Sequence, residues 1–177
     1  MEIKRIGSRE VYRSRWMTLR EDEITRPSGY QGVYGVVEKR DFAVIAAVDG
    51  EQIYLVEQYR YPVAERFWEL PQGSCESARL TPEELAATEL REETGLQASQ
   101  MLHAGHLFLA YGFCTQGYDI FLATDLTQGP TQLEPEEEGL ICQPFAIAEV
   151  ERMILDGEIR DATTVAAFGL LRMKDLL

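Results

Sequence analysis

Three glutamates stand close together near the middle of the chain: Glu89, Glu92 and Glu93. Residues three and four apart lie on one face of a helix, so these positions would present three carboxylates together. Their mutual repulsion becomes an advantage if they share a divalent cation, and Mg²⁺ and Mn²⁺ are hard ions that favour carboxylate oxygens. The spacing alone is more typical of a solvated acidic helix face than of a metal site, so the surrounding residues have to separate the two interpretations.

The segment around these glutamates carries clear signals for the two ends of a helix. Thr81 suits the N-cap, Pro82 suits the first helical position, and Glu84 completes a T-x-x-E capping box. Gly95 can adopt the left-handed conformation that ends a helix. We therefore predict a helix within residues 80–95. Its core-facing positions would be Leu85, Ala86, Leu90 and Thr94.

The remaining elements are expected to form a sheet that supports this helix. Apolar runs and turn residues predict a strand pair within residues 11–24 and strands over residues 32–39, 42–48, 52–59, 107–109 and 119–123. Asp49-Gly50 would join two of these strands as a hairpin. Two closing helices are expected over residues 147–157 and 163–176. This order predicts an α+β fold with helices packed on the sheet.

The composition sets the broad class. With 177 residues, 45% of them apolar, the chain has the size of one domain with a substantial core. Its net charge of −13 argues against a nucleic-acid partner. The longest apolar run, residues 42–48, argues against a membrane span, and the first residues do not resemble a signal peptide. Cys75, Cys114 and Cys142 are too few and too scattered for a disulfide framework or a zinc site, so we expect a cytoplasmic protein.

Residues 73–96, GSCESARLTPEELAATELREETGL, resemble the Nudix box, the loop–helix–loop signature of the Nudix hydrolases. The match is strongest over the final ELREETGL. The preceding WELPQG resembles the strand before the box in ADP-ribose and nucleotide-sugar pyrophosphatases. Two positions depart from the family pattern. Thr88 replaces the family's arginine, and the loop after Gly73 is one residue longer, so the family's early glutamate falls near Leu80.

The resemblance implies a fold and an organisation. The Nudix fold is an α/β/α sandwich with a mixed β-sheet and helices on both faces. Residues 1–38 would form an N-terminal β arm of the same domain, and residues 39–177 the hydrolase part. The arm is similar to the segment that related pyrophosphatases use to dimerise, so the resemblance implies a homodimer.

The resemblance also implies a Mg²⁺ or Mn²⁺ site and a general base. Glu89 and Glu93 would be the main metal ligands and Glu92 the third, joined by the backbone carbonyl of Gln72. The base would lie on the later acidic loop, residues 134–138, with Glu138 preferred and Glu136 as the alternative. A run of acids offers no spacing argument for one member over another.

Two residues before the box are candidates for substrate binding. By resemblance, Arg60 would contact phosphate, and Glu69 would contact the substrate or a metal ligand. A surface arginine paired with an acid, and a structural glutamate at a strand end, are the alternatives. His103 and His106 are expected to be ordinary strand residues rather than a metal pair.

The resemblance therefore implies a metal-dependent pyrophosphohydrolase. It would cleave ADP-ribose or a related nucleoside diphosphate sugar into nucleoside monophosphate and sugar phosphate. Residues 110–114 lack the proline that ADP-ribose enzymes typically carry near this place, so other nucleotide sugars stay open. One alternative is a nucleoside triphosphate or dinucleoside polyphosphate pyrophosphohydrolase. Another is a non-catalytic Nudix domain that senses a nucleotide, although the retained helix acids favour catalysis.

Overall fold

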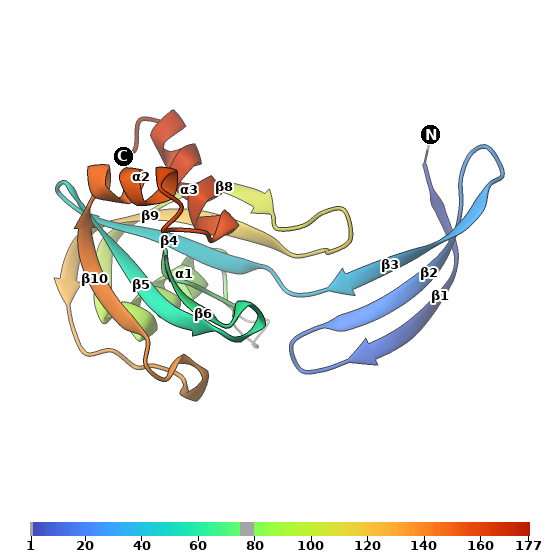
Figure 1. Ribbon diagram of the computed structural model, residues 1–177, viewed down its shortest axis with the longest axis horizontal. Coiled ribbons are helices and arrows are strands. Elements are labelled where there is room, and N and C mark those ends of the chain that lie inside the picture. Colours follow the sequence, from blue (N-terminus) through green and yellow to red (C-terminus); the bar gives the residue numbers. More distant parts are fainter. Residues whose placement is uncertain (1, 75–79) are drawn as a thin grey trace. The chain divides into compact units, whose positions relative to one another are not determined.

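The computed structural model describes residues 2–74 and 80–177, which belong to two compact units (Figure 1). The first unit comprises Met1–Asp41 and Leu107–Tyr118, and the second comprises Phe42–His106 and Asp119–Leu177. Among the described residues, no helix is both long and apolar enough to cross a membrane.

The first unit is built on a three-stranded antiparallel sheet of order β1–β2–β3. Its strands are β1 (Lys4–Arg13), β2 (Thr18–Thr25) and β3 (Gln31–Glu38). The segment Leu107–Tyr118 pairs with β3, because the Tyr34 hydroxyl donates to the carbonyl of Gly112 at 2.7 Å and Val37 forms a parallel bridge to Cys114. The predicted strand pair and the strand that follows it are confirmed, although the first strand begins earlier than expected.

The second unit contains a mixed sheet of order β10–β5–β4–β9–β8, with β6 beside β5 and β7 beside β4. The strands are β4 (Phe42–Asp49), β5 (Gln52–Arg60), β6 (Glu65–Glu69), β7 (Gln72–Gly73), β8 (Leu96–Phe108), β9 (Gly117–Gln128) and β10 (Ile141–Ala146). The helices are α1 (Pro82–Thr94), α2 (Ile147–Leu155) and α3 (Ala162–Met173), with short 3-10 turns η1 (Tyr61–Val63) and η2 (Pro135–Glu137).

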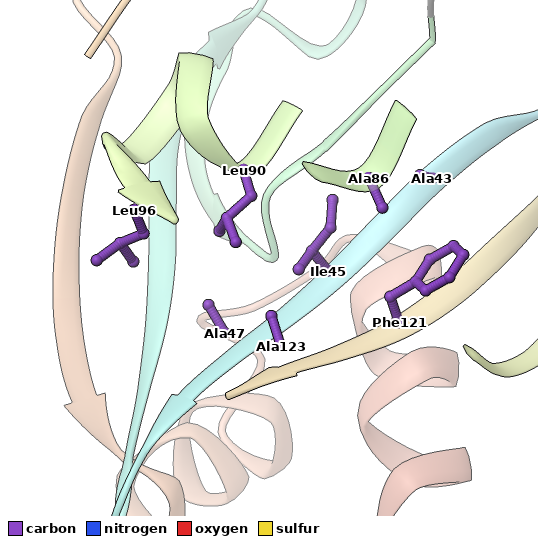
Figure 2. Packing of buried hydrophobic residues seen from close by; sticks show 8 residues of the cluster. All are labelled: Ala43, Ile45, Ala47, Ala86, Leu90, Leu96, Phe121 and Ala123. Atoms are coloured by element: carbon purple, nitrogen blue, oxygen red, sulfur yellow. The ribbon is translucent and has the colours of Figure 1, made fainter. Parts of the chain in front are cut away.

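Strand β4 lies at the centre of the core. Successive side chains of a strand point to opposite faces, and residues 43–47 are all fully buried, so both faces of β4 are covered. Helix α1 packs on one face, as Figure 2 shows, and α3 contacts β4 from the other. The side chains of the α1 face are Ala43, Ile45, Ala47, Ala86, Leu90, Leu96, Phe121 and Ala123. The predicted α/β/α sandwich is confirmed.

A split in this sheet makes room for the segment before α1. Strands β4 and β5 pair directly only at Val48–Ile53 and Asp49–Gln52, and then diverge. Beyond that point β6 pairs with β5 and β7 pairs with β4. The short connection between β6 and β7 therefore crosses from one strand to the other, and it brings the backbone of Gln72 and Gly73 against α1.

Candidate active site

Three carboxylates converge beside α1. Glu89 and Glu93 lie one turn apart on the helix, and Glu137 comes from η2; each offers an oxygen within 4.8 Å of the other two. We call this set the carboxylate group. Only 2% of Glu93 and 9% of Glu89 is exposed. Acidic side chains are rarely buried to this extent unless they are paired or bind a metal, so the arrangement needs a counter-charge.

The backbone of β7 orients one member of the group. The N–H of Gln72 donates to Glu93 Oε2 at 3.1 Å. The pairing of Val44 with Gln72 fixes the direction of that N–H, because it belongs to a strand in register with β4. The Glu93 carboxylate is therefore held by main chain as well as by its own packing.

The electrostatics of the group are one-sided. Burial, together with the smaller effect of the nearby charges of Glu92, Glu137 and Glu134, raises the pKa of Glu89 to about 7. Burial also raises the pKa of Glu93 well above its usual range, with Glu137 and Glu89 adding to the effect. The charges that act most strongly on the pKa of these two glutamates are those of other carboxylates. An all-oxygen donor set with uncompensated negative charge fits a hard divalent cation.

The raised pKa of Glu89 predicts how the stability of the metal-free protein depends on pH. The pKa is about 7 in the folded state against an ordinary 4.5, so unfolding releases a proton between these values. The free energy of unfolding should therefore fall as the pH rises through this window, by up to about 3 kcal/mol from this residue. Urea titrations in EDTA at pH 5, 6, 7 and 8 measure the slope. In Glu89→Gln the slope should flatten, and equal slopes in the two proteins would contradict the raised pKa.

Gly73 is required by the position of the Glu89 side chain. A Cβ atom added at Gly73 would lie 2.9 Å from Glu89 Oε1 and closer still to Oε2. Real Cβ atoms essentially never come this close to another heavy atom. The glycine that begins the box therefore leaves space for a carboxylate of the helix.

Gly73→Ala is expected to displace the Glu89 carboxylate and lower kcat/KM for hydrolysis by about 100-fold, because small misplacements of catalytic groups have effects of this size. Melting temperature should change little, since the clashing atoms end a flexible side chain. Gly169→Ala in α3 is the matched control, because a Cβ there meets nothing within 4 Å. A folded Gly73→Ala protein with activity equal to that of Gly169→Ala would show that the close approach does not matter.

Arg60 and Glu69 form an ion pair with each other. Arg60 Nε lies 3.2 Å from Glu69 Oε2, and a second guanidinium nitrogen donates to Oε1. Gln58 Nε2 also donates to Oε1, at 2.9 Å. Burial raises the pKa of Glu69, whereas the charge of Arg60 lowers it. The Arg60 side chain remains 41% exposed despite this ion pair, and its predicted phosphate contact stays a prediction.

Three other predicted site residues are not members of the carboxylate group. Glu92 is half-buried and 3.5 Å from Arg91, outside the group of three. Glu136 and Glu138 are exposed, whereas Glu137 between them is half-buried and reaches the group. Sequence reasoning did not single out Glu137. The sequence signal for Glu137 was Pro135, because proline favours the first position of a helical turn and Glu137 is then at the third. At that position the Glu137 side chain accepts a hydrogen bond from the N–H of Glu134 at 2.8 Å.

Among residues 2–74 and 80–177, no histidine or cysteine belongs to the carboxylate group. His103 Nε2 and His106 Nδ1 lie 2.8 and 3.3 Å from the same oxygen, Oδ1 of Asp119, and both histidines are on β8. Cys114 and Cys142 are free thiols. Cys75 lies outside the described residues.

Family models cover most of the chain. Residues 38–168, well over half of it, match the family model described as the NUDIX domain. The chain belongs to the Nudix family. Residues 3–37 match a second model, the nucleoside diphosphate sugar hydrolase N-terminal domain. The family predicted from the box and the strand before it is confirmed, and with it the assignment as a hydrolase.

Relatives of this Nudix protein cover nearly its whole length. It is 35% identical over 167 residues to an ADP-ribose pyrophosphatase of Mycobacterium tuberculosis, covering 93% of this chain and 81% of the relative. It is 26% identical over 179 residues to an ADP-ribose pyrophosphatase of Bacillus subtilis, covering 100% of this chain and 96% of the relative.

A crystal structure described as that of an ADP compounds hydrolase has the same fold. It superposes with a TM-score of 0.88 at 20% identity, covering 100% of this chain and 98% of that one. At that identity the likeness concerns the fold alone, and it confirms the predicted Nudix fold.

Proposed function

We propose that this Nudix hydrolase cleaves the diphosphate of ADP-ribose, or of a closely related nucleoside diphosphate sugar, into nucleoside monophosphate and sugar phosphate. The observation that carries the proposal is the carboxylate group, in which the buried Glu89 and Glu93 of the box helix meet the half-buried Glu137. A diphosphate carries concentrated negative charge, so a site of this kind can accept it only together with cations.

Mg²⁺ or Mn²⁺ is the proposed cofactor, held by Glu89 and Glu93, with Glu92 and the carbonyl of Gln72 as the further predicted ligands. Support comes from the all-oxygen donor set and from the raised pKa of both buried glutamates, since each favours a bound cation over a free carboxylate. Such a cation supplies charge neutralisation at the diphosphate and makes water a better nucleophile.

We assign proton removal to the acidic loop, residues 134–138. Water attacks one phosphorus, the bridging P–O bond breaks, the leaving phosphate keeps the bridging oxygen, and a carboxylate accepts the proton. Glu138 and Glu136 were predicted for this role. We favour Glu137, because its carboxylate lies within 4.8 Å of those of Glu89 and Glu93, and because burial raises its pKa.

The choice of ADP-ribose rests on the relatives. Two that cover most of this chain are named ADP-ribose pyrophosphatases, and the N-terminal match points to nucleoside diphosphate sugars in general. We propose that Arg60, whose side chain is partly exposed, contacts a phosphate of the substrate, with Glu69 holding the arginine in place.

We also propose a homodimer and a cytoplasmic location. The dimer would form through the predicted arm, residues 1–38, which exposes Ile6, Tyr30 and Val33. Light scattering coupled to size-exclusion chromatography would give twice the 20.1 kDa chain mass if this is so, and the single mass if it is not. The location rests on the small number of cysteines.

The test of the activity is a substrate panel with Mg²⁺ or Mn²⁺. The panel contains ADP-ribose, GDP-mannose, UDP-glucose, diadenosine polyphosphates and nucleoside triphosphates, and the readout is nucleoside monophosphate release. Release of AMP from ADP-ribose that is lost in EDTA supports the proposal. If only triphosphates or dinucleoside polyphosphates are turned over, the protein is instead a nucleoside triphosphate or dinucleoside polyphosphate pyrophosphohydrolase. Nucleotide binding without turnover of any substrate would favour the sensing domain.

A further inference from the structure

Helix α3 begins beside the connection between β6 and β7. Its N-cap, Asp161, accepts at Oδ2 from the N–H of Thr164 at 2.8 Å and from the Thr164 hydroxyl at 2.7 Å. The same oxygen accepts from the side-chain amide of Gln72, with Nε2 at 3.1 Å. A capping residue needs only the first of these bonds, so the contact with Gln72 is additional to helix capping.

A second bond ties the start of α3 to the same connection. The Thr164 hydroxyl oxygen accepts from the N–H of Leu70 at 2.9 Å, and both residues are fully buried. Leu70 and Gln72 are therefore each held by the first turn of α3, one through its backbone and the other through its side chain.

The opposite side of this connection is held by β4. The N–H of Ile45 donates to the carbonyl of Pro71 at 2.9 Å, and Val44 pairs with Gln72. The backbone of Gln72 thus lies between a strand and a helix start. Its N–H points to Glu93 Oε2, so any shift of Gln72 moves the donor that orients this carboxylate.

We propose that Asp161 is a positioning residue for the carboxylate group, acting through Gln72 on Glu93. This inference rests on the proposed function, because Glu93 is the proposed metal ligand. Asp161 accepts the Gln72 amide, the amide fixes the residue in β7, and the backbone N–H of that residue fixes the carboxylate. Partners that orient metal ligands in this way typically change metal affinity by about 10- to 100-fold when they are removed.

The test compares Asp161→Ser with Asp161→Asn. Serine caps a helix about as well as aspartate but is too short to reach Gln72, whereas asparagine keeps an acceptor of the same length. We expect Mn²⁺, titrated by electron paramagnetic resonance without substrate, to bind Asp161→Ser about tenfold more weakly than wild type. Asp161→Asn should stay within about threefold, and the melting temperatures of the metal-free proteins should agree.

Gln72→Ala completes a double-mutant cycle. If Asp161 acts through the Gln72 side chain, Gln72→Ala should weaken Mn²⁺ binding about tenfold, and adding Asp161→Ser to it should have no further effect. Additive effects would overturn the inference, as would unchanged Mn²⁺ affinity in Asp161→Ser or in Gln72→Ala. If Asp161→Ser fails to fold, the Mn²⁺ affinity of Gln72→Ala still tests whether the Gln72 side chain positions the carboxylate group.

The substrate panel, run on the same preparations, separates this inference from the proposed function. Wild-type protein that hydrolyses ADP-ribose, alongside an Asp161→Ser variant that binds Mn²⁺ normally, would overturn the role of Asp161 and leave the activity standing. Wild-type protein that neither binds Mn²⁺ nor hydrolyses any substrate would overturn both.

Discussion

Glu93→Gln is expected to lower metal-dependent hydrolysis by at least about 100-fold while leaving the metal-free protein folded and more stable at pH 8. The carboxylate is 2% exposed, and burial together with Glu137 and Glu89 raises its pKa. A neutral amide of the same shape removes the charge that a cation needs and also the repulsion within the group. It keeps an oxygen that accepts from the N–H of Gln72.

The measurements are kcat/KM for ADP-ribose at saturating Mg²⁺ and the melting temperature in EDTA. Glu83→Gln is the control on the same helix, because Glu83 lies exposed in its first turn. Glu92→Gln tests whether Glu92 is the third metal ligand, as the sequence predicts, or has no part in metal binding, as its position outside the carboxylate group suggests. A folded Glu93→Gln enzyme as active as Glu83→Gln would exclude Glu93 as a metal ligand.

The helix that carries these residues could be predicted closely. Thr81, Glu84 and Gly95 form the expected capping box and left-handed C-cap, and the helix runs over Pro82–Thr94. Local hydrogen bonds decide both ends, so the local sequence contains the information. Strands β4 and β5 could be predicted equally well, because central buried strands have runs of consecutive apolar residues.

Strand β10 was missed, β8 was expected only over residues 107–109, and β6 and β7 were expected only as the single strand before the box. Strands β8 and β10 lie at the ends of the strand order, so most of their side chains are exposed and show no apolar alternation. Pro144 also argues against a strand unless it lies at an edge. Strand β7 has only two residues, and it forms because β4 and β5 diverge, which no local pattern records.

The two helix members of the carboxylate group, Glu89 and Glu93, could be predicted from their spacing in the sequence, whereas Glu137 could not. Glu89 and Glu93 are one turn apart, so a helix necessarily brings them together. In the acidic run of residues 134–138 every member has the same chemistry, and the direction of each side chain depends on how η2 packs against α1. Gln72 and Asp161 are 89 residues apart in the chain, so their contact could come only from the three-dimensional structure.

Among the acids of the late loop, Glu137→Gln is expected to lower kcat by about 100-fold or more, as the loss of a general base does. Glutamine keeps the acceptor that Glu134 N–H uses at 2.8 Å, so η2 should persist. Mn²⁺ affinity should change by less than about threefold if Glu137 accepts the proton rather than holding the metal. A parallel loss of Mn²⁺ affinity would instead make Glu137 a ligand.

Glu136→Gln and Glu138→Gln are the matched controls, since they remove the same charge from the same loop at exposed positions. Both should retain kcat within about threefold of wild type, because exposed charges contribute little. Loss of about 100-fold in Glu138→Gln or Glu136→Gln, with Glu137→Gln fully active, would return the base to the residues predicted from the sequence. It would also mean that the loop rearranges when substrate binds, because neither side chain reaches the carboxylate group in this structure.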